Sequence, residues 1–461
     1  MERRELLRKI ALGTSGTILL PSFLSSCGND DDDIAPVNTD KSVIVIGAGI
    51  SGIAAAKMLK DKGFKNIIVL EGSNRMGGRI WTDNSGSIPI DLGASWIHGK
   101  DGGNPITAIA QNANASTFIT DDDKIKIYDT DGSLYTDGGI DTADATYDSY
   151  LSQITAQGDV NKSFEEVLLE INSNALNDRL IKYQLSAYTE FDSGADITDL
   201  SSLYHDNDEK YPGADLLMTN GYIKVVAYLA EGLDIRYNQK VSEIDYAETQ
   251  TKITTNQGNF NADFVVVSVP LGVLKKGIIN FSPVLSAAKH TALSRMAMGT
   301  NNKVALFFEE AFWDTSSHYI GFTPETKGKY NYFLNFRAFS DNNVLMTFAF
   351  GGYGVAMEQN NEAQITADIM EHLTAIYGAA NVKQPTKVLI TNWDSNPLAH
   401  GAYTYIPKGA SPADLDEIAA QIDDKIFFAG EHTTEDYIGT VHGAYLTGNW
   451  AAEAIIDVVN K

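Results

Sequence analysis

Cysteine is almost absent from this chain: Cys27 is the only one among 461 residues. The part of the chain beyond it therefore has no disulfide, no thiolate metal ligand and no cysteine nucleophile. Basic residues are also scarce, because 35 lysines and arginines stand against 60 aspartates and glutamates and give a formal net charge of −25. This imbalance argues against nucleic acid as a partner, since a phosphate-binding surface needs a basic face. An acidic surface suits a cationic small molecule, and it suits simple solubility outside the cell equally well.

Residues 1–27 lack the long apolar run that a permanent membrane helix needs. Four basic residues precede a short run of apolar and small residues, which is typical of a cleaved export signal. The last four residues, Leu-Ser-Ser-Cys, resemble a bacterial lipobox, in which Cys27 is lipidated. Arg3 and Arg4 fit a twin-arginine signal or a Sec signal, and the sequence leaves both open. We expect an exported protein, anchored by lipid to the bacterial cell envelope on its periplasmic or surface face.

A polar tether and then a large folded part follow this signal. Residues 28–40 contain three consecutive aspartates, and we expect them to form a tether that is too polar to pack. The whole chain is 43% hydrophobic and 10% aromatic, which is enough to bury a large core. Its length fits two domains.

A strand, a glycine-rich turn, a helix and a second strand open the folded part. Residues 42–46 form a continuous apolar run, which predicts a parallel strand buried on both faces. Helical periodicity follows the turn and ends at Gly63, and residues 66–71 give the second strand. This order predicts a βαβ unit.

The turn between strand and helix carries a G-x-G-x-x-G fingerprint. Gly47 permits the tight turn, Gly49 lets backbone amides approach a pyrophosphate, and Gly52 lets the helix lie close to the strand. Ser51 belongs to the same helix start. Glu71 ends the second strand about 20 residues further on, where an acid binds the ribose hydroxyls of a dinucleotide. The fingerprint and the acid together predict a dinucleotide-binding site.

Further elements are expected along the rest of the chain. The patterns predict helical patches within 106–211, successive strands within 233–269 with a turn at 256–258, strands at 303–308 and 344–350, an amphipathic helix at 365–378, a buried strand at 425–429 and a final helix from about Gly443.

The motifs after Glu71 distinguish a flavin cofactor from a nicotinamide one. Gly77 and Gly78 form a second glycine pair beside Arg79, so that backbone and guanidinium can meet one diphosphate from its other side. Residues 91–99, Asp-Leu-Gly-Ala-Ser-Trp-Ile-His-Gly, look most like polyamine oxidases. Over residues 41–461 the chain resembles the flavin-containing amine oxidases, whose motif order it follows at 265–274, 298–303, 312–313, 393 and 428–433.

The resemblance implies which residues hold an FAD. In the family the backbone of 91–99 passes the flavin ring, Val241 contacts the adenosine half and Glu431 contacts the ribityl or pyrophosphate part. Glu431 would also end a buried strand, where an unpaired acid is costly. A helix start at Thr440 or Val441 would favour the negative charge of reduced flavin. The full set of expected cofactor contacts is Gly47, Gly49, Ser51, Gly52, Glu71, Gly78, Arg79, Gly93, Ala94, Ser95, Val241, Trp393, Gly430, Glu431, Thr440 and Val441.

The resemblance also implies residues near the reacting atoms. Lys303 matches a lysine that the family places near flavin N5 through a water, although an isolated strand-end lysine more often faces solvent. Tyr403 matches one of two aromatic residues around the substrate amine, and Thr440 replaces the other. His98 stands where some polyamine oxidases carry an acid or a histidine, and a purely structural histidine is equally compatible. Ala402 takes the place of the cysteine that binds flavin covalently in mitochondrial monoamine oxidases, so we expect a non-covalent FAD.

The predicted fold class is α/β, with a discontinuous Rossmann-like FAD-binding domain and a mixed α+β substrate domain of amine oxidase type. We expect the FAD-binding domain to combine three segments and the substrate domain two. The expected divisions are a lipoprotein signal at 1–27, a tether at 28–40, FAD-binding segments at 41–105, 212–290 and 388–461, and substrate segments at 106–211 and 291–387.

The reaction implied by the resemblance is oxidation of a CH–NH or CH–NH2 group, with a polyamine as the favoured substrate. Hydride would pass from the amine to flavin N5, the imine would hydrolyse, and O2 would reoxidise the flavin to give H2O2. Neither a metal nor a nucleic acid is expected. Three alternatives remain at this point: an amino-acid oxidase, for which Arg337 is the nearest carboxylate-binding candidate, a desaturase, and a surface lipoprotein that only binds a ligand.

Overall fold

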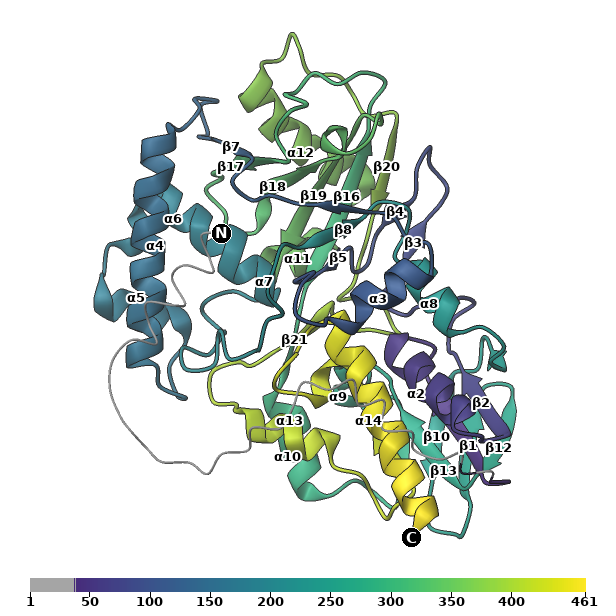
Figure 1. Ribbon diagram of the computed structural model, residues 1–461. Helices are drawn as coiled ribbons and strands as arrows, with labels where there is room; N and C mark the ends of the chain where they lie inside the picture. The colour runs from purple at the N-terminus through teal and green to yellow at the C-terminus, as the bar shows by residue number, and fades with distance from the viewer. Residues whose placement is uncertain (1–36, 38) are drawn as a thin grey trace.

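The computed structural model describes residue 37 and residues 39–461, and Figure 1 shows the arrangement of their helices and strands. The predicted signal at 1–27, with Cys27, and nearly all of the tether at 28–40 lie outside the described residues. Export, lipid attachment and the twin-arginine alternative therefore remain predictions. No helix within the described residues is both long and apolar enough to cross a membrane.

A five-stranded parallel sheet gathers strands from distant parts of the sequence. Its strand order is β22-β13-β1-β2-β9, and β1 pairs with both β13 and β2. The central strands are continuous apolar runs because helices or a second sheet cover both faces. The strands are β1 (Ser42–Ile46), β2 (Asn66–Leu70), β9 (Ile235–Arg236), β13 (Phe264–Val267) and β22 (Ile426–Phe428).

Helices cover one face of this sheet and an antiparallel sheet covers the other. On the first face α14 lies beside α2, as Figure 1 shows, because Gly448 brings its backbone against the carbonyl of Ser51. The other face packs against the sheet β12-β11-β10-β14, whose β11–β12 hairpin contains the predicted turn. The elements are α2 (Ile50–Asp61), α3 (Pro105–Asn112), α8 (Ile223–Leu229), α14 (Val441–Asn460), α9 (Leu271–Lys275), α10 (Ala287–Arg295), α13 (Pro412–Ala419), β10 (Val241–Asp245), β11 (Thr251–Thr255), β12 (Gly258–Ala262) and β14 (Asn280–Ser282).

A six-stranded sheet forms the second large layer, with order β20-β16-β19-β18-β17-β7. Helix α12 buries its apolar stripe on one face, and the other face turns toward residues 90–96. The predicted strands at 303–308 and 344–350 correspond to β16 and β19. The elements are β7 (Ile125–Tyr128), β16 (Asn301–Phe307), β17 (Tyr319–Phe322), β18 (Lys329–Asn335), β19 (Val344–Phe350), β20 (Lys387–Ile390), η3 (Phe336–Ala338), α11 (Gly351–Met357) and α12 (Glu362–Tyr377).

A group of helices stands beside this sheet, at the left of Figure 1. It includes a π-helix, η2, which leads directly into α7 and thereby into the site described below. The elements are α4 (Asp137–Gln157), α5 (Phe164–Ile171), η1 (Ala175–Asn177), α6 (Arg179–Gln184), η2 (Leu185–Glu190) and α7 (Phe191–Ser193). Short elements complete the fold: β3 (Thr82–Asp83), β4 (Ile90–Asp91), β5 (Trp96–Ile97), β6 (Thr117–Ile119), β8 (Leu216–Met218), β15 (Ala297–Gly299), β21 (Tyr403–Tyr405) and η4 (Glu431–Thr433).

The predicted mixture of helices and strands is confirmed at the level of fold class. The parallel sheet draws its strands from 41–105, 212–290 and 388–461, while the division into domains at those boundaries stays a prediction. The final helix begins at Val441, two residues before the start that the apolar pattern predicted but at the position considered for the flavin contact, because Thr440 caps it.

Candidate functional site

One cavity of about 2420 Å³ extends from the carboxyl ends of the parallel strands to helix α4. The edge outside the carboxyl ends of such strands is where open α/β sheets bind ligands. The volume is well above the roughly 300–1,000 Å³ of a pocket for one drug-sized ligand, so the cavity has room for a dinucleotide and a substrate.

The glycine turn forms one end of this cavity. Gly47 has φ +108°, which a side chain would strain, and a Cβ on Gly52 would lie 2.1 Å from the Gly47 carbonyl oxygen. A Cβ on Gly49 would meet no atom within 4 Å, because this residue faces open space. Ser51 Oγ is buried in the same helix start and has no hydrogen-bond partner. An accessible backbone and an unpartnered hydroxyl at a helix N-terminus fit a phosphate group.

The second glycine pair lies against the first. Gly77 N–H donates to the Ala48 carbonyl at 2.8 Å, and a Cβ on Gly78 would lie 3.4 Å from Gly49 Cα. Arg79 follows directly and also lines the cavity. The two glycine segments and an arginine therefore surround the same space, as the sequence predicted.

Glu71 closes the turn from the side of β2. Its carboxylate is buried and accepts hydrogen bonds from Ala48 N at 2.8 Å and Ser73 N at 2.7 Å. Val241, expected beside the adenosine, lines the cavity in the same region. Glu71 thus stabilises the glycine turn through these hydrogen bonds, in addition to any contact with a ribose.

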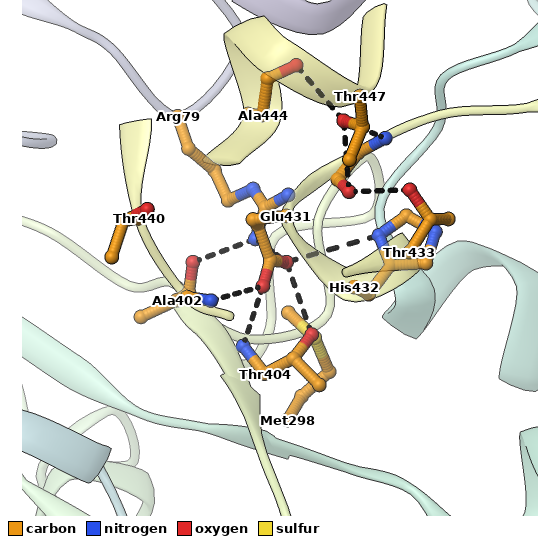
Figure 2. A network of polar contacts seen from close by, with 12 residues as sticks. Arg79, Met298, Ala402, Thr404, Glu431, His432, Thr433, Thr440, Ala444 and Thr447 are labelled. Carbon is orange, nitrogen blue, oxygen red and sulfur yellow. Dashed lines mark hydrogen bonds and ion pairs between the residues drawn. The ribbon is translucent and has the colours of Figure 1, made fainter. Parts of the chain in front are cut away.

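A buried ion pair joins the first segment of the chain to the last (Figure 2). Arg79 Nη1 lies 2.7 Å from Glu431 Oε1 and 3.0 Å from the Ala402 carbonyl oxygen. Glu431 also accepts from the hydroxyl and backbone N–H of Thr404 and from Gly439 N. Burial alone would raise the pKa of Glu431, but the charges of Arg79 and His432 and the hydrogen bonds from Arg79 and Thr404 together outweigh it, and the net shift is downward. The acid at the end of the buried strand is therefore paired within the protein: Glu431 positions Arg79, and both residues line the cavity.

Thr440 is the N-cap of α14. Its hydroxyl accepts from Gly443 N at 2.9 Å and donates to the Tyr437 carbonyl at 2.8 Å. The predicted helix start at Thr440 and Val441 is present, and both residues line the cavity. The hydroxyl hydrogen of Thr440 is therefore already used within the protein.

Lys303 is buried at the start of β16 and does not face solvent. Its Nζ donates to the carbonyls of Asp91 at 3.0 Å and Gly93 at 2.5 Å, and it also hydrogen-bonds Ser95 Oγ. Trp96 lies near the same ammonium, with 5.6 Å from Nζ to the ring centroid. Burial lowers the pKa of Lys303 to about 7, against the opposing effect of the Asp91 carboxylate. Lys303 thus ties the 91–95 segment to the six-stranded sheet.

Tyr403 is held rigidly in the cavity wall. Its hydroxyl donates to the Phe191 carbonyl at 2.6 Å and accepts from Asn301 Nδ2 at 3.1 Å. A Cβ on Gly194 would lie 3.2 Å from the ring, so the absence of a side chain there makes room for it. Burial raises the pKa of Tyr403, and the hydroxyl stays protonated at neutral pH.

His98 forms a hydrogen-bonded pair with Asp215 at the substrate end. His98 Nδ1 lies 2.8 Å from Asp215 Oδ2, while Gly99 N donates to Oδ1 at 2.9 Å. Desolvation by the cavity wall lowers the pKa of His98, but the hydrogen bond and charge of Asp215, together with the charge of Asp192, shift it upward overall. His442 lies nearby, edge-on to the stacked rings of Tyr211 and Tyr437, and burial lowers its pKa to about 3. Sequence reasoning missed Asp215, because nothing local links it to a histidine 117 residues away.

Acidic residues dominate the far end of the cavity. Four of them recur at helical spacing on α4 (Asp137, Asp141, Asp144 and Asp148) and line the cavity together with residues 121–123. This spacing could have been found in the sequence. Within the described part of the chain, the cavity wall includes two arginines, Arg75 and Arg79, both at the glycine-turn end. Arg337 lies elsewhere, on η3, where it bonds the Asp341 carbonyl, so it is no carboxylate-binding residue of this site.

The cavity brings together nearly all residues that the sequence nominated. Among the expected cofactor and catalytic residues the exception is Gly52, which packs the helix against the turn behind the wall. No cluster of three or more metal-ligating side chains occurs within the described residues.

Comparison with known proteins agrees with this geometry. The model of the family described as flavin containing amine oxidoreductase matches residues 50–456. Polyamine oxidase 4 of Oryza sativa subsp. japonica is 32% identical, over 95% of this chain and 91% of its own length. Polyamine oxidase 2 of Arabidopsis thaliana is 34% identical, over 89% of this chain and 87% of its own length. Lysine-specific histone demethylase 2 of Homo sapiens is 31% identical over 93% of this chain, which spans 55% of that protein.

A family match over most of the chain and a cavity lined by the family's motifs lead to one conclusion. The chain belongs to the flavin-containing amine oxidoreductases and is a flavin-dependent oxidoreductase that acts on amines.

Proposed function

We propose that this protein is an FAD-dependent amine oxidase whose preferred substrate is a polyamine. The observation that carries the proposal is the charge of the substrate end, where the acidic face of α4 and residues 121–123 line the cavity. A substrate with several ammonium groups is attracted electrostatically by each of these carboxylates, whereas a substrate with a carboxylate would be repelled. Relatives named polyamine oxidase support the same choice.

The cofactor end fits a non-covalent FAD. Glu71 would bind the ribose, Ser51, Gly49, Gly78 and Arg79 the diphosphate, and the N-terminus of α14 the flavin. The bound flavin supplies the hydride acceptor for the amine C–H. Ala402 occupies the position expected for covalent attachment, and the sole cysteine is Cys27.

Two side chains have roles in moving protons and charge. His98 would take the proton from the substrate ammonium, because a neutral amine is the form that gives up hydride. Asp215 would hold the imidazole with Nδ1 protonated and Nε2 free to accept. Lys303 would place its charge where oxygen takes up electrons.

The rival functions lack comparable support. An amino-acid oxidase needs a cation for the substrate carboxylate, but the arginines of the cavity wall lie at the cofactor end, and Lys210, which also lines the cavity, is already paired with Asp206 and Asp208. A desaturase of apolar substrates would gain nothing from the acidic face of α4. A lipoprotein that only binds a ligand would not need a buried lysine such as Lys303, whose proposed role is to supply charge for the reaction with oxygen. We propose the cell envelope as the location, on the basis of the N-terminal motif alone.

Steady-state kinetics at several ionic strengths test the substrate class. Spermidine and spermine should show kcat/KM falling steeply with salt, because several charges are steered together, while a simple monoamine should show a shallow dependence. Turnover of amino acids but not of these amines would overturn the proposal. H2O2 release in the same assay tests oxygen as the acceptor.

A further inference from the structure

Asp91 ends strand β4, and its backbone and its side chain bind two different groups. The carbonyl oxygen of Asp91 accepts a hydrogen bond from Lys303 Nζ at 3.0 Å. The carboxylate accepts from Tyr222 N, at 3.0 and 3.1 Å to its two oxygens, and from the hydroxyl of Thr82. The side chain is buried and does not line the cavity. It therefore lies behind the cavity wall, and the proposed reaction has so far given it no role.

These hydrogen bonds fix the Asp91 carboxylate close to the Lys303 ammonium. The carboxylate carbon is two bonds from the Cα whose carbonyl group accepts from Nζ, so the two charges are only a few ångströms apart. Nζ has three hydrogen-bond partners, and the carboxylate is not one of them. Both side chains are buried, so little water screens the attraction between them. The carboxylate thus acts on the ammonium through space.

Within the described residues, Asp91 is the one charged side chain that acts on the Lys303 ammonium. The other neighbours of Nζ are two uncharged oxygens and the rings of Trp96 and Phe348, whose centroids lie 5.6 and 5.9 Å away. Burial lowers the pKa of Lys303 and the Asp91 carboxylate opposes this effect, which leaves the pKa at about 7. Burial raises the pKa of Asp91 to about 6, against the hydrogen bonds from Thr82 and Tyr222. The protonation of each group therefore depends on the other.

We propose that Asp91 is a positioning residue whose carboxylate keeps the Lys303 ammonium protonated at neutral pH, and so keeps its charge available for the reaction of reduced flavin with oxygen. This inference rests on the role proposed for Lys303 and deepens it. The carboxylate acts through Lys303 and not on the substrate, because it lies behind the cavity wall. Thr82 and Tyr222 in turn stabilise the charged form of Asp91.

The test replaces Asp91 with asparagine and follows the reaction of photoreduced flavin with oxygen in the stopped flow as a function of pH. Asparagine keeps an oxygen that can accept from Tyr222 N and Thr82, but it carries no charge. Without the carboxylate the pKa of Lys303 should fall further below its usual range. The loss of rate that follows deprotonation of Lys303 should occur about one pH unit or more below its wild-type position, and the rate at about pH 7 should drop about 5-fold or more.

The shape of the pH profile separates this effect from a structural defect. In acid the rates of the wild type and of Asp91→Asn should converge, because Lys303 is protonated in both. A defect in packing would slow the variant at every pH.

Asp263→Asn is the matched control. Asp263 also accepts hydrogen bonds from a backbone N–H and a hydroxyl, both of Ser42, but it precedes β13, at the end of the parallel sheet away from the cavity. This variant should leave the pH profile at its wild-type position. If Asp91→Asn fails to fold, Thr82→Val tests the same charge. Loss of the hydroxyl donor favours protonated Asp91, so the profile should move in the same direction by a smaller amount.

A double-mutant cycle gives a readout that needs no turnover. The unfolding of the FAD-loaded wild type, Asp91→Asn, Lys303→Met and the double variant is measured in urea. The hydrogen bonds that Lys303→Met removes are lost in both backgrounds, so they cancel and the cycle reports the attraction between the two charges. The unfolding equilibrium constants should be non-additive by roughly 2- to 150-fold at about pH 6.5, and close to additive at about pH 9, where Lys303 is neutral.

The outcomes separate this inference from the proposed function, because photoreduction of the flavin needs no amine. An unmoved pH profile in Asp91→Asn, or additive unfolding at about pH 6.5, overturns the Asp91 assignment alone. A wild-type rate that does not vary with pH and equals that of Lys303→Met overturns the role of Lys303 and this inference with it. Flavin that no amine reduces overturns the proposed substrate class, while a displaced pH profile in Asp91→Asn would still support the role of Asp91.

Discussion

Replacing Lys303 with methionine should slow the reaction with oxygen much more than the reaction with amine. The three hydrogen-bond partners of Nζ are uncharged oxygens, and the Asp91 carboxylate acts on the charge without a hydrogen bond to it. The first electron taken up by oxygen creates an anion. A unit charge about 6 Å from it contributes roughly 3 kcal/mol at an effective dielectric constant of about 20. The rate constant for reoxidation should therefore fall about 100-fold.

The pH dependence of the reoxidation rate gives a second test of the same charge. Burial lowers the pKa of Lys303 to about 7, so the charge is present below that pH and is lost as the pH rises through it. Reoxidation of the wild type should slow across this window. The methionine variant should be slow at every pH, because it has no proton to lose.

Stopped-flow measurement of the two half-reactions checks the prediction. The variant leaves the carbonyls of Asp91 and Gly93 without a donor, so FAD content and Tm must be measured alongside. Unchanged rates in both half-reactions would refute the reasoning and leave Lys303 a structural tie between β16 and the 91–95 segment. Equal slowing of both would show that the lysine positions the substrate instead.

Three other predictions concern the cofactor. The flavin should be non-covalent because Ala402 replaces the attaching residue, so acid precipitation should release all of the yellow colour, and colour in the pellet contradicts this. Glu71→Ala should weaken FAD binding, since a charged acceptor contributes about 1.5–3 kcal/mol, and wild-type affinity in a titration would exclude Glu71 as the ribose ligand. Gly49→Ala should leave the Tm of the FAD-free protein unchanged, because the added Cβ enters open space, but it should weaken FAD binding. Gly52→Ala should instead lower the Tm, because its Cβ would lie 2.1 Å from the Gly47 carbonyl oxygen, and we expect a loss of about 1–3 kcal/mol in the free energy of unfolding. Equal behaviour of the two alanine variants would contradict the roles given to these glycines.

Local sequence signals were sufficient for the βαβ unit. The apolar run, the glycine turn and Glu71 all lie within one short stretch, and the predicted strands match β1 and β2 to within a residue. Such elements are predictable because strand burial and turn geometry act between near neighbours.

Contacts between distant residues were not predictable in the same way. The pairing of Arg79 with Glu431 spans 352 positions, and only the folded sheet brings the two together. The same holds for Asn301 and Tyr403, whose hydrogen bond depends on the π-helix that presents the Phe191 carbonyl. Sequence periodicity also could not assign the hydroxyl of Thr440 to the capping of α14, since a threonine at this position is compatible both with a helix cap and with a place beside the substrate amine.

The central claim is that the cavity delivers a polyamine to a bound flavin. Anaerobic mixing of the oxidised protein with spermidine, spermine, simple monoamines and amino acids tests it directly, since bleaching of the flavin registers reduction whatever the final acceptor. The polyamines should bleach the flavin at the lowest concentrations. Bleaching by amino acids alone, or by none of these compounds, would contradict it.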